Sequence, residues 1–150
     1  MNEFEYCFKV HNLEKVIDYL KEEGFSLLSA NKQVRTIFQG NGFIARITKD
    51  YIDDNVYYSL DFKEDKITEE FTIRKESLPL SFTDEKAALS IIEFLGYPLK
   101  NEVTRFRWVL VKDEVKCELD EYSFGDKVVA VEGDNEKAEI VYKKLKELKA

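Results

Sequence analysis

The sequence is poor in the residues that build disulfide scaffolds, histidine-rich metal centres and membrane spans. It has one histidine and two cysteines, Cys7 and Cys117, which lie far apart and form no C-x-x-C pair. This usage fits a reducing compartment better than a disulfide framework, and we expect both cysteines to be packing residues. No apolar run approaches the ~20 residues that cross a bilayer. We therefore expect a cytoplasmic protein with no membrane partner.

Common enzyme motifs and positive charge are also in short supply. The sequence contains no P-loop, no G-x-G-x-x-G and no H-E-x-x-H pattern, which excludes the usual helix-based phosphate cradle and the zinc-protease motif. Its 23 Lys and Arg residues against 30 Asp and Glu give a formal net charge of -7. We expect no nucleic-acid partner, because that affinity comes mainly from cations that neutralise phosphates. A small polyphosphate held by a few converging basic residues is still compatible with this balance.

Apolar and aromatic residues, by contrast, are abundant. Hydrophobic residues make up 44% of the 150 positions and aromatic residues 13%, which is enough to offset the entropy cost of ordering the backbone. The length suits one domain with a sizeable core and is short for two. We therefore expect a single domain over residues 1–150.

The periodicity of the sequence predicts an α+β fold. Charged and apolar residues alternate over residues 3–10, which is typical of a strand. Apolar residues at helical spacing predict helices that begin near Asn12, Thr83 and Asp134, and the first two end at Gly24 and Gly96. Runs rich in Val, Ile, Phe and Tyr predict further strands near residues 33–39, 43–49, 55–63, 68–76, 102–112, 115–121 and 127–132. This order favours an antiparallel eight-stranded β-barrel, closed or nearly closed, braced by about three helices.

The apolar faces of these elements are expected to form the core. In the second helix we expect Ala88, Ile91, Ile92 and Leu95 on the buried face. In the strands, the residues expected to meet the helices are Phe4, Phe43, Ile47, Phe62, Phe71, Ile73, Phe106, Trp108 and Leu119.

A short internal repeat is visible at an offset of 72 residues. Gly24-Phe25, followed by a strand with Arg35, is matched by Gly96-Tyr97, followed by a strand with Arg107. Such self-similarity predicts two related halves that face each other across a shared cavity.

Charged side chains gather on one face of the predicted strands. In one interpretation this is the solvated face of an antiparallel sheet with cross-strand ion pairs. In the other, the same residues line a closed barrel, where acids hold divalent cations and bases hold phosphate oxygens. Closure of the barrel distinguishes the two. The residues concerned are Glu3, Glu5, Lys9, Arg35, Arg46, Asp61, Lys63, Glu70, Arg74, Glu76, Arg105, Arg107, Glu118, Asp120 and Glu132.

Several short motifs resemble those of the CYTH family, the triphosphate tunnel metalloenzymes that include class IV adenylate cyclases and thiamine triphosphatases. In the first half, the motifs similar to E-x-E, L-R-I-R and L-T-L-K are Glu3-Phe4-Glu5, Ala45-Arg46-Ile47-Thr48 and Leu60-Asp61-Phe62-Lys63. In the second half, those similar to LG-aromatic, K-x-R, LDE and E-x-E-G are Leu95-Gly96-Tyr97, Arg105-Phe106-Arg107, Leu119-Asp120-Glu121 and Ala130-Val131-Glu132-Gly133. The chain departs from the family pattern at Cys7, Thr48 and Ala130, where signature charges are missing.

The resemblance implies roles for particular residues. The metal ligands would hold Mg²⁺ or Mn²⁺ and are Glu3, Glu5, Asp120 and Glu132. The catalytic residues would be Glu3 and Glu5 together with Lys9, which stands two residues beyond the missing lysine. The residues that would bind the phosphates are Arg35, Arg46, Lys63, Arg74, Arg105 and Arg107.

The implied function is metal-dependent binding and hydrolysis of a triphosphate, either tripolyphosphate or an organic or nucleoside triphosphate, inside a charged tunnel. Two alternatives stay open. One is adenylate cyclase activity that forms cAMP from ATP. The other is a catalytically degenerate protein that only binds a nucleotide or polyphosphate, since three signature charges are missing. The sequence also leaves open whether the chain forms a homodimer.

Overall fold

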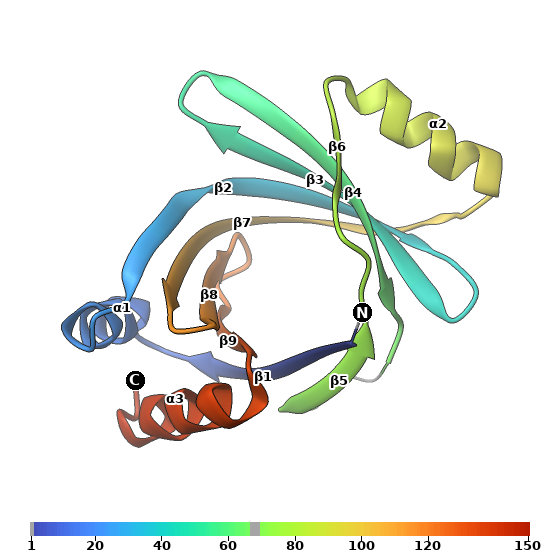
Figure 1. Ribbon diagram of the computed structural model, residues 1–150. Helices are drawn as coiled ribbons and strands as arrows, with labels where there is room; N and C mark the ends of the chain where they lie inside the picture. The colour runs from blue at the N-terminus through green and yellow to red at the C-terminus, as the bar shows by residue number, and fades with distance from the viewer. Residues whose placement is uncertain (1, 67–69) are drawn as a thin grey trace. The chain divides into compact units, whose positions relative to one another are not determined.

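The structure confirms the predicted α+β class. The computed structural model describes residues 2–66 and 70–150, with the backbone alone at residues 2 and 3. Within these ranges the chain forms nine strands and three helices (Figure 1). The helices are α1 (Leu13–Glu22), α2 (Glu85–Leu95) and α3 (Asn135–Glu147). The strands are β1 (Asn2–Val10), β2 (Ser26–Gln39), β3 (Phe43–Ile52), β4 (Asn55–Glu64), β5 (Phe71–Lys75), β6 (Leu80–Phe82), β7 (Leu99–Lys112), β8 (Val115–Tyr122) and β9 (Lys127–Gly133).

The described residues divide into two compact units, which we take one at a time. The first unit contains β2 from Asn31 onward, β3, β4, β5 from Arg74 onward, β6, α2 and β7 up to Thr104. The second contains β1 from Glu3 onward, α1, β2 up to Ala30, β5 up to Ile73, β7 from Arg105 onward, β8, β9 and α3. The single domain expected over residues 1–150 stays a prediction.

The first unit is an antiparallel set of strands in the order β2-β3-β4-β6, with α2 on one side. Its buried side chains come from β2, β3, β4 and α2 and are Phe38, Ala45, Ile47, Leu60, Ala88 and Ile92. The burial of Ala88 and Ile92 was expected, but Ile91 and Leu95 are exposed. Helix α2 therefore buries a narrower stripe than its sequence predicts.

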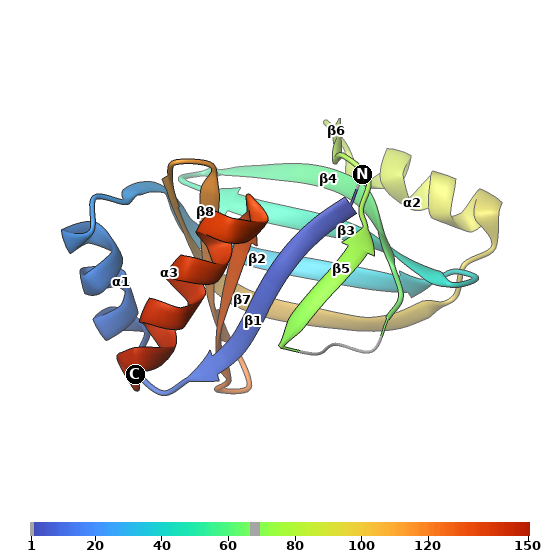
Figure 2. The same cartoon turned by 60° about the horizontal axis from the view of Figure 1, so that its bottom comes forward.

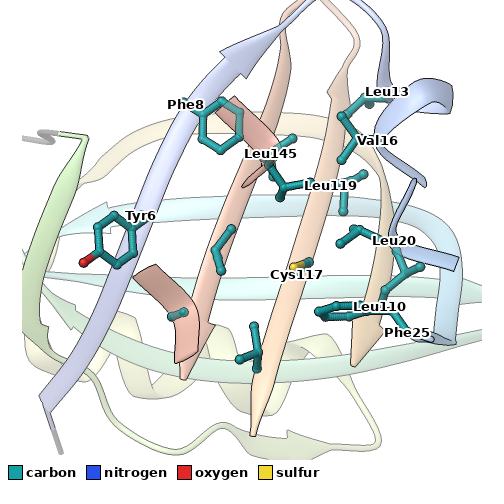
Figure 3. Packing of buried hydrophobic residues seen from close by; sticks show 14 residues of the cluster. Tyr6, Phe8, Leu13, Val16, Leu20, Phe25, Leu110, Cys117, Leu119 and Leu145 are labelled. Atoms are coloured by element: carbon teal, nitrogen blue, oxygen red, sulfur yellow. The ribbon is translucent and has the colours of Figure 1, made fainter. Parts of the chain in front are cut away.

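The second unit joins its strands in the order β5-β1-β9-β8-β7, and helices α1 and α3 cover one face of them. Figure 2 shows α3 running along the β8 and β9 strands. Figure 3 shows Phe8, Leu119 and Cys117 pointing from the strands to the same side as Val16, Leu20 and Leu145 of the helices. Leu20, Leu119 and Leu145 are at most 1% exposed. The core of this unit is therefore a sandwich of helices and one sheet face.

Local capping explains where the helices begin. Asn12 accepts a hydrogen bond from the Lys15 N–H at 3.1 Å, and Asp134 accepts one from the Lys137 N–H at 3.1 Å. Both residues were expected near the start of a helix, and short polar side chains at this position satisfy the first N–H groups of the helix. Helix α2 is capped by Asp84, which accepts from the Lys86 N–H at 2.7 Å, rather than starting at Thr83.

The internal repeat is confirmed in the order of elements. The first residues of α1, β3 and β4, which are 13, 43 and 55, become 85, 115 and 127 when shifted by 72, and these are the first residues of α2, β8 and β9. The pairing register repeats as well. Arg35 lies opposite Thr48 in β2–β3, and Arg107 lies opposite Asp120 in β7–β8, again 72 residues apart. The cavity expected between the halves stays a prediction.

Other expectations need correction. The described chain has nine strands rather than eight, because β6 is a three-residue strand too short to show a period. Three side chains assigned to the core, Phe71, Ile73 and Phe106, keep 38%, 41% and 38% of their surface exposed. Phe71 packs on the Tyr6 ring at 4.7 Å and Phe106 on Trp108 at 4.6 Å, so these two rings stand at the margin of a core.

The two cysteines differ, and neither is bonded to the other. Cys117 is fully buried in the core of the second unit, as expected for a packing residue. Cys7 is only partly buried and lies on the opposite side of the sheet, because strand alternation turns it away from Tyr6 and Phe8. In the described ranges, no helix is long and apolar enough to cross a membrane.

Candidate functional site

One face of the strands in the second unit carries charged side chains, and the other carries the core. Residues opposite each other in antiparallel strands point to the same side of the sheet. The register therefore places Glu5, Glu132 and Lys116 in one row, and Arg107 and Asp120 in another. We call this surface the acidic face. Its residues are Glu5, Arg105, Arg107, Lys116, Glu118, Asp120 and Glu132.

Arg107 is held by two carboxylates of the acidic face. Its Nε and Nη2 atoms donate to Oδ1 and Oδ2 of Asp120 at 2.7 and 2.8 Å, and Nη1 donates to Oε2 of Glu118 at 2.6 Å. Burial opposes the charge on Arg107, but Glu118 and Asp120 outweigh it and hold the pKa of the guanidinium above its ordinary value. Each of the three guanidinium nitrogens of Arg107 thus donates to a carboxylate, which fixes the orientation of the guanidinium plane on the sheet.

Arg105 extends this network by one row. Its Nη1 atom lies 3.6 Å from Oδ2 of Asp120 and donates to the Tyr122 hydroxyl at 3.3 Å. The guanidinium also sits over the Tyr122 ring, 5.9 Å from its centre, which is a cation–π arrangement. The Arg105 side chain is 4% exposed, so its charge is almost fully withdrawn from water.

Two further carboxylates stand side by side on the acidic face. Glu5 lies opposite Glu132 in the β1–β9 pair, and both residues are buried, at 7% and 8% exposure. The Nζ atom of Lys116 lies 3.3 Å from Oε2 of Glu132 and 3.9 Å from Oε2 of Glu118. Across the described part of the chain, no three Asp, Glu, His or Cys side chains are grouped closely enough to hold a metal ion by themselves.

The missing signature charges at Cys7 and Ala130 fall in a single row of the acidic face. Cys7 lies opposite Ala130, and Ala130 lies opposite Glu118. This row separates the Glu5–Glu132 row from the one with Asp120 and its partner Arg107. Two neutral side chains therefore interrupt the charged surface where the resemblance predicts a lysine and an acid.

Two of the proposed catalytic residues, Lys9 and Glu3, are not among the residues counted in the acidic face. Lys9 lies on the same side of β1 as Glu5, but its side chain is 75% exposed and its Nζ atom pairs with Oδ2 of Asp126 at 3.0 Å. The side chain of Glu3 lies outside the described residues. The catalytic roles of both stay predictions.

The first unit has its own charged surface on the side away from α2, and we call it the basic face. Its residues are Arg35, Arg46, Asp61, Lys63 and Glu76. Arg46 lies opposite Asp61 and its Nε atom donates to Oδ1 of Asp61 at 2.9 Å, while Nη2 bonds to Oδ2 of Asp61 and donates to Oε1 of Glu76 at 2.7 Å. Lys63 Nζ lies 3.9 Å from Oε2 of Glu76. Arg46 and Lys63 are 6% and 7% exposed.

The two remaining residues proposed to bind phosphate are Arg35, which lies on the basic face, and Arg74, which lies in β5. Arg35 donates from Nε to the Thr48 hydroxyl at 3.1 Å, so the third missing charge, at Thr48, leaves a neutral partner for this guanidinium. Arg74 is partly buried and shares one side of its strand with Thr72, because successive residues of a strand alternate.

A pocket of about 400 Å³ opens at one end of the basic face. The backbone of Ser77 is held to β4, since its N–H donates to the carbonyl oxygen of Phe62 at 2.9 Å. Phe62 also lines the pocket but points to the α2 side of β4 and packs against the core of the unit, whereas Lys63 and Glu76 belong to the basic face. The lining is Gly42, Phe43, Phe62, Lys63, Glu64, Lys75, Glu76 and Ser77.

Sequence reasoning did not assign Glu76, Lys116 or Glu118 to the site. Glu76 and Glu118 were recognised as charges on strand faces, and that alternation was the available signal. Their contacts with Arg46, Lys63 and Arg107 depend on how the strands pair. Some of these strands are distant in sequence, and others are joined by turns whose residues give no signal of the pairing register.

Comparison with known proteins identifies solved structures that share this fold. No family model and no curated protein matches the sequence. The PH1012 protein of Pyrococcus horikoshii is 22% identical, with a TM-score of 0.75 over 96% of this chain and 88% of that chain. A Vibrio parahaemolyticus protein proposed as an adenylate cyclase is 16% identical, with a TM-score of 0.70 over 95% and 82%. A Hippeastrum protein proposed as an adenylyl cyclase, and described as having a dominant triphosphatase activity, is 14% identical, with a TM-score of 0.68 over 98% and 87%.

At these identities the likeness concerns the fold. The two proposed cyclases are CYTH-type structures, and each covers nearly the whole of this chain. The order of motifs in the sequence and the order of elements in the structure thus lead to the same family of folds. This chain shares the fold of these solved structures.

Proposed function

We propose that this protein binds a triphosphate and hydrolyses its terminal phosphate with the help of Mg²⁺ or Mn²⁺. The observation that carries the proposal is the burial of cations on strand faces. Arg46, Lys63 and Arg105 are 6%, 7% and 5% exposed and stand among carboxylates. Taking such charges out of water is costly and adds little net stability even when they are paired. Their concentration on one side of the strands in each unit is explained by a highly charged ligand.

The phosphate-binding residues would be the cations of the two faces, in the roles that the resemblance implies. Arginine presents a planar fork that matches two oxygens of a phosphate, and lysine acts as a compact charge. Carboxylates already fix the guanidinium planes of Arg46 and Arg107. A polyphosphate that approaches would therefore meet oriented donors, which lowers the entropy cost of binding. The closed tunnel expected from the resemblance stays a prediction.

The acidic face supplies carboxylates that fit a hard divalent cation. Glu5 and Glu132 lie directly opposite each other and are buried. Mg²⁺ is commonly bound by one or two carboxylates together with phosphate oxygens of the substrate. Glu5 and Glu132 would therefore hold the ion jointly with the triphosphate, with Glu3 and Asp120 as the further proposed ligands. When bound, the ion would neutralise charge on the phosphate oxygens.

The reaction requires little from the protein beyond positioning and charge neutralisation. Water attacks the terminal phosphorus, the bond from that phosphorus to the bridging oxygen breaks, and the shortened polyphosphate leaves with the bond electrons. Arg46, Lys63, Arg105 and Arg107 would stabilise the charge that builds up on the phosphate oxygens. The proposed catalytic residues of the first strand are Glu3, Glu5 and Lys9.

The test compares tripolyphosphate, ATP and thiamine triphosphate with Mn²⁺, with Mg²⁺ and with a chelator. Binding is measured by calorimetry, and inorganic phosphate is measured as the product. We expect metal-dependent phosphate release, and Arg46→Gln should weaken binding by at least about tenfold, since a charge-assisted hydrogen bond contributes about 1.5–3 kcal/mol. The matched control is Lys49→Gln. Lys49 is on the same strand but pairs with Glu85 of α2 at 2.9 Å, on the other side of the sheet.

The products separate the alternatives. If ATP yields cyclic AMP and diphosphate, the protein is an adenylate cyclase and not a triphosphatase. Tight binding without any product would mean a binding protein, and the neutral row at Cys7 and Ala130 would then account for the lost catalysis. No binding of any triphosphate, with Arg46→Gln equal to Lys49→Gln, would overturn the proposal.

A further inference from the structure

Helix α2 of the first unit carries an apolar stripe that the chain leaves in water. Ile91, Phe94 and Leu95 are 36%, 91% and 41% exposed, and Ala87 is exposed as well. These three residues follow Ala87 by four, seven and eight positions, which puts all four on one side of the helix. We call these four residues the outer stripe. It is separate from the residues by which α2 packs on the strands of its unit (Figure 1).

The internal repeat provides a comparison for the outer stripe. Positions 87, 94 and 95 correspond to positions 15, 22 and 23 of the α1 segment, 72 residues earlier. The residues there are Lys15, Glu22 and Glu23, and all three are exposed. At the same place in the repeat, α1 thus presents charged side chains to water and α2 presents apolar ones. Contiguous apolar surface of this kind is typical of an interaction site.

The occupant that fits the outer stripe is another helix. In the second unit, α1 has α3 as its neighbour, since Leu20 and Leu145 belong to one core cluster. Lys15, the repeat counterpart of Ala87, donates from Nζ to the carbonyl oxygen of Leu148 just after α3, at 2.9 Å. Among the described residues of the first unit, α2 is the only helix. Helix α2 therefore lacks the neighbouring helix that α1 has, and its side chains at the corresponding positions are apolar.

The charges beside the outer stripe favour a second copy of α2 as that helix. Lys86 and Glu93 are both exposed, and their spacing of seven residues, about two turns, puts them on the same side of α2. The neighbouring acid Glu85 pairs with Lys49 at 2.9 Å, whereas Lys86 and Glu93 form no ion pair within the described part of the chain. When two copies of a helix pack antiparallel across a two-fold axis, the same side of each helix meets. Lys86 of each copy then stands beside Glu93 of the other copy.

We propose that this protein forms a homodimer in which the outer stripes of two α2 helices pack antiparallel. The two-fold axis passes near Ser90, which lies about midway between Lys86 and Glu93 in the sequence. The same register puts Phe94 of one copy over Ala87 of the other, a large side chain against a small one. One helix from each copy makes an interface at the low end of the usual size range, so we expect a dissociation constant in about the micromolar range.

The dimer is independent of the proposed triphosphate function. The basic face lies on the side of the strands away from α2, so the outer stripe takes no part in it. Failure of one proposal leaves the other intact.

The first experiment measures sedimentation velocity of the full-length protein from about 1 to about 300 µM, a range that covers weak dimers. We expect the fraction of dimer to rise with concentration. Phe94→Glu should weaken the dimer at least about tenfold, because an aromatic side chain at the centre of an interface carries much of the binding energy. Phe94 is 91% exposed, so the variant should fold, and circular dichroism checks this.

The matched control is Phe124→Glu. Phe124 is 66% exposed and lies in the turn between β8 and β9, away from the outer stripe. This variant should dimerise like the unchanged protein. A monomer at every concentration, or equal effects of Phe94→Glu and Phe124→Glu, would overturn the proposal.

The second experiment tests the antiparallel pairing by reversing charges. Lys86→Glu alone and Glu93→Lys alone should each weaken the dimer several-fold, up to about tenfold, because both ion pairs become contacts between like charges. The double variant should dimerise like the unchanged protein, since every contact is again between opposite charges. An equimolar mixture of the two single variants should dimerise more strongly than either variant by itself, for the same reason. A dimer that is insensitive to the single reversals, or that neither combination restores, would contradict the pairing of α2 with α2.

Discussion

Arg107 lies opposite Asp120 and binds both of its carboxylate oxygens, at 2.7 and 2.8 Å, whereas its repeat counterpart Arg35 lies opposite Thr48 and bonds to a hydroxyl at 3.1 Å. The same register thus carries an ion pair in one half of the repeat and a neutral hydrogen bond in the other. On the acidic face the arginine is anchored by carboxylates, and on the basic face carboxylates are fewer than cations. The two halves differ in charge but share one backbone pattern.

Removing Arg107 alone is expected to destabilise the fold, although the complete network adds little net stability. Arg107→Ala leaves Glu118 and Asp120, whose side chains are 13% and 5% exposed, without their shared cation. Breaking a buried pair from one side typically costs about 3 kcal/mol or more. The free energy of unfolding in urea measures this loss. Lys116→Ala, which removes a side chain that is 45% exposed, should cost less than about 1 kcal/mol. Similar values for the two variants would contradict the assignment.

The neutral residue at Thr48 is expected to matter for phosphate binding. Thr48→Asp puts a carboxylate opposite Arg35 and two residues from Arg46 on the same face. It copies the Arg107–Asp120 pair into the basic face and adds a negative charge beside the proposed phosphate-binding cations. We expect tripolyphosphate affinity to fall by about tenfold, measured by calorimetry. Thr48→Asn, of the same size but uncharged, should change it by less than about twofold. Equal losses would show that shape rather than charge is responsible.

Local signals in the sequence predicted the helices and the charged faces well. Asn12 and Asp134 act as caps within their own turns, and alternation along β7 is enough to put Arg105 and Arg107 on one side. These features depend on residues a few positions apart. The repeat was visible for the same reason, because its two copies carry similar short patterns.

Contacts between strands were not predictable in this way. The register of β7 on β8 is set by a two-residue turn at Asp113 and Glu114, both with positive φ of 47° and 66°. Such turns are usually signalled by Asn-Gly or Asp-Gly, and Asp-Glu is no such signal. Because the partner of Arg107 follows from this turn, the sequence could place its charge on a face but could not name Asp120 and Glu118 as its partners.

The free energy of unfolding is expected to fall at alkaline pH because of the buried thiol of Cys117. Burial, together with Glu132 and Glu118, raises the pKa of Cys117 from 9.0 to about 12. The folded protein therefore keeps the thiol proton where the unfolded chain releases it. The stabilising effect is complete below pH 9 and is lost as pH rises toward 12, with a slope of up to about 1.4 kcal/mol per pH unit. Urea unfolding at pH 8 and pH 10.5 should show a smaller decrease for Cys117→Ala than for the unchanged protein. Parallel decreases would contradict this role.

The end of β9 is expected to tolerate no side chain at Gly133. The residue has φ of +126°, and a Cβ atom there would run into the carbonyl oxygen of Glu114. That oxygen also accepts a hydrogen bond from the Asp134 N–H at 3.2 Å, so the strand end cannot simply move away. Gly133→Ala should therefore cost more than about 2 kcal/mol, combining backbone strain with a backbone contact. Gly42→Ala, with φ of +78° and open space around it, should cost only about 1 kcal/mol. Because Gly133 follows Glu132, Gly133→Ala should also weaken Mn²⁺-dependent triphosphate binding, and an unchanged affinity would argue against Glu132 as a ligand.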